Sequence, residues 1–505
     1  MTEASVYRSP TLGVILATLG VVLFAAVLRC GMYITLYDDD TELFVYMGKL
    51  ATQGGRIGYE LIDNKLPTVS MAMWLPYTLI GPWWPGYFLF SLALAVISVV
   101  AVVAAATRVY PDSKWPTLAA AATWMSFPIA VFSAFKLEHI QLAAAAVAAW
   151  AFVRCWQRQT LRDAFLIGLC AGFGAYAKPN ALSVLAAAGA SVVYWRHVSL
   201  NIRVRILTAM AAGLLVPSVI AIVYLVRTGT LSTLPDTYAE IRSYNVNSVF
   251  DSNIVFWKIL FLIILIATPI LMRAFAERHG RQPAVAGQRE LMLFAGLWLA
   301  LETAGAVMQG RMYGYHFLPL TAPAALLFGL IPRRPVGRTI VGSCLPVMLM
   351  GGFWFWAATS TTVPPYTRID AINYVKAHAA PNDRLWIDQY GRALVDSDLK
   401  PGSAVPLTFI FSNNDTAPTR FGAMICSDLR QRKTRWVILP SDCVAHANKW
   451  RALRSEFCYR PVRGDAYVRA WTKLENYVRS AYVPVNVNSD YTVYERREAV
   501  ASVGE

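Results

Sequence analysis

The stretch 37–67 opens with YDDDTELF at 37–44 and closes with IDNKLP at 62–67. It follows a long apolar segment directly, and four of its first six residues are acids: Asp38, Asp39, Asp40 and Glu42. Apolar residues between Leu43 and Ala51 then recur at helical spacing, and Gln53-Gly54-Gly55 predicts the end of that helix. Such a density of acids beside a bilayer segment indicates more than a connecting loop.

Composition indicates a membrane protein. The 505 residues are 56% hydrophobic and only 15% charged, whereas soluble proteins carry about 25% charged residues. We therefore predict a polytopic α-helical membrane protein. The net charge of +15 agrees with the excess of Lys and Arg in cytoplasmic loops and with attraction to anionic lipid headgroups. Nucleic acid is therefore not an expected partner, whereas the lipid bilayer is.

About eleven segments are long and apolar enough to be predicted as transmembrane helices. They are 11–36, 84–107, 115–133, 139–156, 164–177, 179–196, 206–226, 254–272, 291–308, 318–331 and 339–358. A further apolar segment, 68–82, is broken by Pro76 and Pro82 and is interpreted as interfacial or re-entrant. We call residues 37–82 the first loop.

Loop charges predict the orientation of these helices. With the N-terminus in the cytoplasm, fifteen Lys and Arg residues fall in cytoplasmic loops and nine in outer loops. An odd number of spans then places residues 359–505 outside the cytoplasm. The sequence thus predicts a multi-pass protein of the inner (cytoplasmic) membrane, with a transmembrane catalytic domain at 1–358 and an extracytoplasmic domain at 359–505.

The segment 359–505 is polar and patterned as a small α/β domain. Helices are predicted at 369–378, 421–432 and 445–457, and strands at 384–388, 406–411, 434–439 and 492–497. Three cysteines lie here on the predicted oxidising side, and both one disulfide and three unpaired thiols remain open: Cys426, Cys443 and Cys458.

The acidic run has two interpretations. Asp39 and Glu42 have the spacing of a capping box, so helix capping explains one acid. Three adjacent acids also repel each other, which raises the pKa of at least one carboxyl and suits it to act as a general base. We take Asp39 and Asp40 as the candidate catalytic pair.

Cations and polar residues elsewhere are predicted to share the outer side with these acids. Lys65 is either a snorkelling lysine or a ligand for a lipid phosphate, and Lys178 and Arg242 are further candidates for that phosphate. Glu138 opens the fourth span, and Tyr315 and His316 enter the tenth. Aromatic residues at such places are commonly an interface belt, so a substrate cavity and a structural role are both open for these three. No His or Cys cluster predicts a metal site.

Several of these motifs resemble polyprenyl-phosphate-sugar-dependent membrane glycosyltransferases, such as protein O-mannosyltransferases and the lipid A aminoarabinose transferase. The matching residues are Asp39-Asp40 with the helix to Gly54, Tyr59 to Pro67, Glu138, Gly174 to Lys178, and Tyr315-His316-Phe317-Leu318-Pro319. The sequence departs from the family pattern at Asp40, which is usually Glu, and at Leu66 and Ala177.

The resemblance implies a glycosyltransferase-C fold and an inverting transferase of the cell envelope. Its donor would be a polyprenyl-phosphate-linked monosaccharide, and its acceptor a glycan, lipid or protein, in lipopolysaccharide or cell-wall glycosylation. Asp39 would be the base and Lys65 would hold the phosphate. No cofactor is implied with certainty, although a divalent metal near the acids would be compatible.

A transporter or flippase for a lipid-linked sugar is the main alternative. In such proteins, acids and helix breaks lie deep within the membrane spans, and the two halves of the chain are structural repeats of each other. The acids recognised above instead gather at one interface, which favours a transferase.

The orientation can be tested by labelling single-cysteine variants with an impermeant maleimide. We expect the cysteine of Ser412→Cys to react in intact cells and that of Ser199→Cys to react only after permeabilisation. Labelling of the Ser199→Cys protein alone in intact cells would refute the predicted orientation.

Overall fold

The computed structural model describes residues 39–57, 60–63, 65–110, 117, 135–235, 237–238, 288–309, 314–330, 368–387, 391–405, 417–440, 464–487 and 491–497. Contacts divide the chain into two compact units. We call the described residues of Pro85–Ala221 and Val249–Thr359 the helical unit. Those of Thr35–Trp84, Ile222–Ser248 and Ser360–Glu505 form the mixed unit. Each unit is described by itself.

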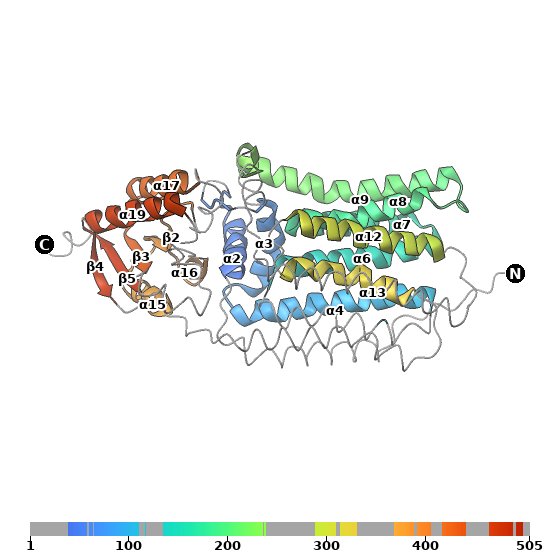
Figure 1. Cartoon of the computed structure of the whole chain (residues 1–505), viewed down its shortest axis with the longest axis horizontal. Helices are drawn as coiled ribbons and strands as arrows, with labels where there is room; N and C mark the ends of the chain where they lie inside the picture. Colours follow the sequence, from blue (N-terminus) through green and yellow to red (C-terminus); the bar gives the residue numbers. More distant parts are fainter. Residues whose placement is uncertain are drawn as a thin grey trace. The chain divides into compact units, whose positions relative to one another are not determined.

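Long apolar helices make up the helical unit, and Figure 1 shows them running side by side. They are α4 (Trp84–Val109), α6 (Leu137–Arg158), α7 (Leu161–Ala177), α8 (Leu182–Val193), α9 (Leu200–Arg227), α12 (Gln288–Met308) and α13 (Thr321–Gly329), with the short 3₁₀ helices η2 (Pro179–Ala181) and η4 (Gly314–Leu320). Trp84 and the residues of α9 after Ala221 belong to the mixed unit. Helix α6 packs on α7, and α12 packs on α8 and α13.

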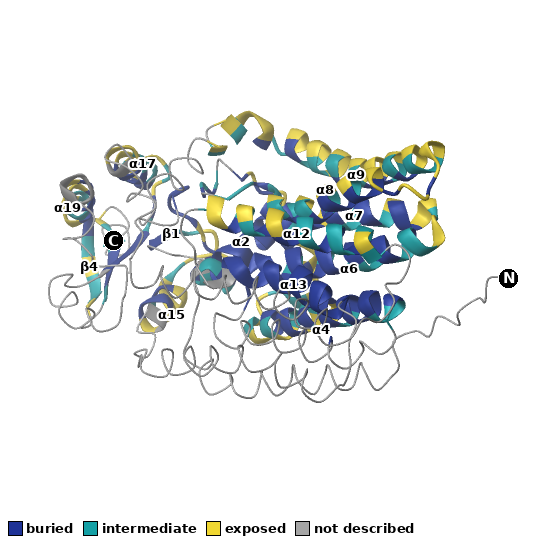
Figure 2. Ribbon diagram, turned by 45° about the vertical axis from the view of Figure 1, so that its right-hand side comes forward, coloured by how far each residue is buried: buried dark blue, intermediate teal, exposed yellow. Residues whose placement is uncertain are grey.

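Four helices among the described residues are long and apolar enough to cross a bilayer: α4, α6, α9 and α12. Helix α9 has many exposed residues, which appear as yellow stretches in Figure 2, and they include large apolar ones: Leu215 is 60% exposed and Val219 55%. So much exposed apolar surface requires lipid around it. The helical membrane protein predicted from composition is confirmed, but the count of eleven spans is not, because predicted spans such as 11–36, 254–272 and 339–358 lie outside the described residues.

Glycines allow α7 and α9 to touch backbone to backbone. A Cβ atom on Gly168 would overlap the Met210 carbonyl oxygen, and one on Gly213 would overlap that of Phe165. Lipid tails are as apolar as the side chains, so helices in a bilayer associate through this kind of close packing rather than through the hydrophobic effect.

The mixed unit combines two helices of the first loop with a sheet near the C-terminus. Its elements are α2 (Asp39–Thr52), α3 (Thr68–Ile80), η3 (Thr230–Thr233), α15 (Arg368–His378), β1 (Arg384–Ile387), α16 (Gly391–Val395), β2 (Lys400–Pro401), α17 (Ala417–Gln431), β3 (Trp436–Pro440), α19 (Gly464–Ala481), β4 (Tyr482–Val487) and β5 (Tyr491–Arg496). Gly54 has φ +70° just after α2, a left-handed conformation that favours glycine and ends the helix as predicted.

Among the described residues, the sheet has five strands in the order β2-β1-β3-β5-β4. Strand β1 is parallel to β2 and β3, whereas β5 is antiparallel to β3 and β4, with Val437 opposite Trp386 on one side and Tyr494 on the other. The buried indoles of Trp386 and Trp436 fill its core. Helices α17 and α19 pack on each other on one side of the sheet, and α15 lies on the other side (Figure 1).

Several elements match the ranges expected from sequence. Helices α15 and α17 and strands β1, β3 and β5 coincide with predicted segments, but α19 and β4 were not predicted. The predicted strand 406–411 and helix 445–457 lie outside the described residues, and the domain boundary at 359 stays a prediction. Trp471, Leu474 and Val478 recur at helical spacing and are buried, so the periodic signal for α19 was present in the sequence.

The contact between α7 and α9 can be tested with one added methyl group. We expect Gly168→Ala to lower the stability of the purified protein by about 1–3 kcal/mol, because the backbone of α9 must move away. Thermal unfolding in detergent measures this loss. The control is Gly296→Ala on α12, where an added Cβ meets nothing within 4 Å; equal melting temperatures for the two variants would contradict the close contact.

Candidate active site

Three charged residues of the stretch 37–67, which are Asp40, Asp63 and Lys65, form an ion cluster in the first loop. The ammonium nitrogen of Lys65 lies 3.2 Å from Asp63 Oδ2 and 3.5 Å from Asp40 Oδ1. It also stands 5.2 Å from the centre of the Phe44 ring. Asp63 is buried, whereas Asp40 and Lys65 keep about a fifth of their side-chain surface exposed. The cluster thus places a carboxylate and a cation in contact where a substrate can still reach both.

Local structure fixes both partners. Asp40 lies in the first turn of α2, and Lys65 lies between a short bridge of Ile57 with Leu61 and the start of α3. The Ile62 amide donates to the Ala404 carbonyl at 2.7 Å, which ties this segment to residues near the sheet.

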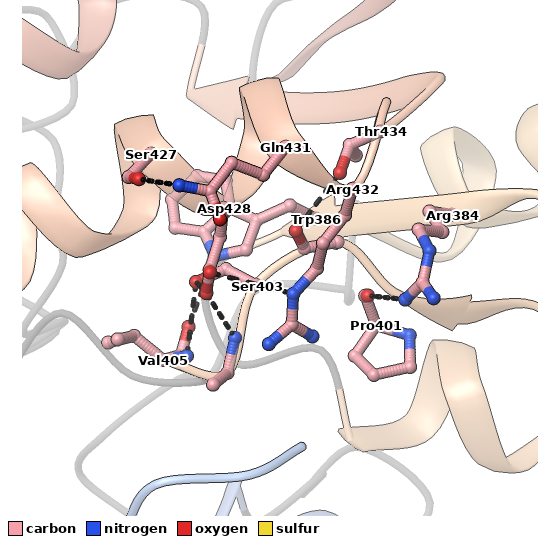
Figure 3. A network of polar contacts seen from close by, with 12 residues as sticks. Arg384, Trp386, Pro401, Ser403, Val405, Ser427, Asp428, Gln431, Arg432 and Thr434 are labelled. Carbon is pink, nitrogen blue, oxygen red and sulfur yellow. Dashed lines mark hydrogen bonds and ion pairs between the residues drawn. The ribbon is translucent and has the colours of Figure 1, made fainter. Parts of the chain in front are cut away.

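A polar network holds residues 401–404, where the Ala404 carbonyl accepts the hydrogen bond from the Ile62 amide (Figure 3). Asp428 on α17 accepts hydrogen bonds from the Ser403 hydroxyl and the Ala404 amide, both at 2.8 Å, and Arg432 lies 3.5 Å from its other oxygen. The Arg384 guanidinium donates to the Pro401 carbonyl at 2.8 Å. The network thus fixes residues 401–404, and with them the position of Ile62 three residues before Lys65.

Burial and neighbouring charges shift the pKa values of Arg384, in this network, and of Tyr46 on α2. Burial and the neighbouring Arg432 lower the pKa of the Arg384 guanidinium, while Glu60 opposes that shift. Burial, followed by the charge of Glu60, raises the pKa of the Tyr46 phenol, so this hydroxyl stays protonated.

Two other cations of the first loop bind backbone carbonyls. The Lys49 ammonium donates to Leu394, Val395 and Ser397 at 2.6, 3.3 and 2.7 Å, and the Arg56 guanidinium donates to Thr228 at 3.0 Å. Burial lowers the pKa of Lys49, and the nearby carboxylates of Asp398 and Asp396 oppose that shift. These contacts give Lys49 and Arg56 structural roles, whereas Lys65 contacts carboxylates of the acidic stretch.

A second ion pair lies in the helical unit. Lys178 follows the last residue of α7, and its ammonium lies 2.8 Å from Glu138 in the first turn of α6 and 3.1 Å from the Gln309 amide oxygen. The predicted turn between two short helices is present, because α7 ends at Ala177 and η2 begins at Pro179. Glu138 is buried. Because Glu138 belongs to α6 and Lys178 follows α7, the pair connects α6 to the turn after α7.

Glu302 was not recognised in the sequence, although it interrupts the apolar run of α12. Its carboxylate is buried and accepts hydrogen bonds from Ser183 at 2.6 Å, Gln141 at 3.0 Å and Trp298 at 3.4 Å. One turn further along α12, Gly305 lies against the Asn180 side chain. An acid within a span was the available signal, because such residues usually face other helices or a cavity.

The predicted site residues are divided between the two units. Asp40 and Lys65 belong to the mixed unit, and Glu138, Lys178 and His316 belong to the helical unit, where His316 is buried in η4. Asp39 is the first residue of α2, and Tyr315 lies in η4. Asp38, Arg242, Cys443 and Cys458 lie outside the described residues, and Cys426 is a free thiol.

In the part of the chain that the structure describes, no group of three or more His, Cys, Asp or Glu side chains is arranged to hold a metal ion.

No protein-family model matches this sequence, and no curated protein matches it either. Among solved structures it is similar to the arabinofuranosyltransferase AftD from Mycobacteria, with a TM-score of 0.53 and 13% identity. The chain has the fold of this transferase. The match covers 97% of this chain and 40% of AftD, so the chain spans about two fifths of AftD's length.

A second similar structure is the Archaeoglobus fulgidus oligosaccharyltransferase, with a TM-score of 0.46 and 11% identity over 95% of this chain and 73% of that one. The first likeness concerns the fold alone, and that fold occurs in a sugar transferase, as the resemblance of the sequence motifs led us to expect.

The Glu138–Lys178 pair can be tested by removing one charge and then both. Lys178→Met leaves a buried carboxylate without its cation, and we expect a loss of about 3–5 kcal/mol in stability. Glu138→Gln combined with Lys178→Met removes both charges and should recover most of that loss in thermal unfolding. A loss below about 1 kcal/mol, as for an exposed pair, would show that Glu138 does not depend on Lys178.

Proposed function

We propose that this chain is an inverting glycosyltransferase that moves a monosaccharide from a polyprenyl phosphate to an acceptor at the outer face of the membrane. The contact of Lys65 with Asp40 and Asp63 carries this proposal. It supplies, within one cluster, a proton acceptor and a cation for a departing phosphate. The glycosyltransferase-C fold supports sugar transfer, while the donor, the acceptor and the side of the membrane are parts of the proposal.

The chemistry needs a base more than an acid. A phosphate leaving group has a second pKa of about 6, so it can depart without being protonated, unlike the leaving oxygen in glycoside hydrolysis. The acceptor hydroxyl instead has to lose its proton as it attacks the sugar. A carboxylate provides that base, and a cation stabilises the charge that develops on the phosphate.

In a single displacement, the acceptor oxygen bonds to the anomeric carbon as the bond from that carbon to the phosphate oxygen breaks. The acceptor proton passes to Asp39 or Asp40, and the phosphate leaves with the bonding electron pair. Lys65 exchanges its carboxylate partners for the phosphate in this step. Attack opposite the leaving group inverts the anomeric carbon.

Amide variants of the two candidate bases separate catalysis from helix capping. Asn and Asp are about equal as N-caps, so Asp39→Asn should leave the melting temperature nearly unchanged. If Asp39 is the base, transfer should fall roughly 10²–10⁴-fold, the usual contribution of general-base catalysis. Transfer is measured as polyprenyl phosphate released from a panel of polyprenyl-phosphate monosaccharides, with membranes of a deletion strain as the source of acceptor.

Asp40→Asn, assayed beside it, identifies the base. Loss of transfer in the Asp40→Asn protein alone would assign proton transfer to Asp40, whereas unchanged transfer in both variants would refute a base in this stretch. Mass spectrometry of lipids and cell-wall glycans from the deletion strain then identifies the missing sugar.

A flippase for a lipid-linked sugar is the second candidate, and buried Glu302 is the observation that favours it. An acid within a span is typical of transport pathways. The assay distinguishes the two functions, because a transferase releases polyprenyl phosphate in detergent micelles, whereas a flippase requires a closed bilayer and releases none.

A further inference from the structure

Helix α2 binds both ends of the short helix α16. The Glu42 carboxylate accepts a hydrogen bond from the Arg392 amide at 3.2 Å, in the first turn of α16. The Lys49 ammonium donates to the Leu394 and Val395 carbonyls at the other end, and also to the Ser397 carbonyl. Glu42 and Lys49 are both buried, with 2% and 8% exposure. About 350 residues of sequence separate the two helices.

The arrangement agrees with the charge distribution of a helix. The free amides at a helix N-terminus favour a negative group, and the free carbonyls at its C-terminus favour a positive one. Glu42 and Lys49 are two turns apart on α2, about 10 Å along its axis. A five-residue helix is about 7.5 Å long, so one face of α2 can reach both ends of α16 when the two run parallel.

Helix α16 depends on this contact for its structure. An isolated helix shorter than about 12 residues is marginal in water, and α16 spans only Gly391–Val395. Asp396 adds a second set of contacts. Its carboxylate accepts a hydrogen bond from the Trp84 indole at 2.8 Å and one from the Arg392 guanidinium at 3.2 Å. The Arg392 guanidinium in turn lies 5.3 Å from the centre of the Trp84 ring. Residues 391–397 are therefore held by Glu42 and Lys49 of the first loop and by Trp84 at the start of α4.

The candidate base lies on the same part of α2. Asp40 precedes Glu42 by two residues, and Phe44, beneath the Lys65 ammonium, follows it by two. The Ile62 amide ties the segment that carries Lys65 to Ala404, so a shift of α2 along α16 would change the distance between Asp40 and Lys65. In an active site, a displacement of about 1 Å can reduce the rate about 100-fold.

We infer that Glu42 and Lys49 are positioning residues, which clamp α2 to α16 and thereby set the contact of Asp40 with Lys65. The expected effect on rate rests on the proposed function, whereas the contact between α2 and α16 does not depend on that function. Residues 391–397 then control the geometry of the proposed active site without contacting substrate.

Hydrogen–deuterium exchange on the full-length protein in detergent tests the clamp without any substrate. Lys49→Met keeps most of the side-chain volume but removes the cation from three carbonyls. We expect exchange to quicken about tenfold or more in both 39–52 and 391–399, while β3 keeps its protection. The matched control is Lys376→Met, which changes an exposed lysine of α15 in the same unit and should leave both segments unchanged. Faster exchange in 391–399 alone, with α2 fully protected, would overturn the clamp.

Kinetics on the same proteins test positioning. We expect Lys49→Met to lower kcat about tenfold or more, and Lys49→Arg, which keeps the cation, to recover part of that rate. Asp40 faces Lys65, which also contacts Asp63, so a longer Asp40–Lys65 distance weakens the stabilisation of the ionised carboxylate. The acid limb of the pH–rate profile should therefore move to higher pH. A mere loss of folded enzyme would scale the profile without moving it.

The outcomes distinguish the two ideas. If the wild-type protein transfers no sugar from any polyprenyl-phosphate donor, the proposed function fails, and the exchange data still decide the clamp. If Lys49→Met loosens both segments but leaves kcat and the pH profile unchanged, the clamp is present and its positioning role is wrong.

Discussion

Burial of the Lys49 ammonium is the constraint on which the mixed unit depends. A buried cation is costly unless hydrogen bonds replace its water, and here the carbonyls at the end of α16 provide them. Each buried polar group left without a partner costs about 1–3 kcal/mol. The geometry of α2 is therefore fixed by residues that lie far away in sequence, and the acidic stretch takes its position from that contact.

Different forces act in the helical unit. Helices in lipid gain little from burying apolar side chains against one another. Instead, Gly168 and Gly213 bring two backbones together, and Glu302 joins α12 to α6 and α8 through donors on all three helices. Polar groups in such surroundings favour one arrangement, because each alternative leaves a donor or acceptor without a partner.

Three cations of the first loop look alike in sequence and differ in the structure. Lys49 and Arg56 bind the carbonyl ends of helices, whereas Lys65 contacts two carboxylates. Lys65 was chosen from the sequence because it lies beside Asp63 before an apolar run. The carbonyl partners of Lys49 come from residues 394–397, which no local pattern connects to α2. Glu42 shows the same limit, because its spacing from Asp39 predicted a capping box, and its carboxylate contacts the Arg392 amide.

Features that depend on local chemistry could be predicted from the sequence alone. Its apolar runs required a bilayer, Gly54 predicted the end of α2, and short runs of apolar and β-branched residues predicted β1, β3 and β5, because hydrophobicity and backbone preference act over a few residues. The acidic stretch also identified where a carboxylate and a cation gather. Only the tertiary structure decided which cation pairs with which acid, that Glu302 is held by three helices, and that α16 is bound at both ends by α2. Most of those contacts join different helices and loops, up to 350 positions apart for Glu42 and Arg392, and their energies depend on distances and burial that a linear pattern does not contain.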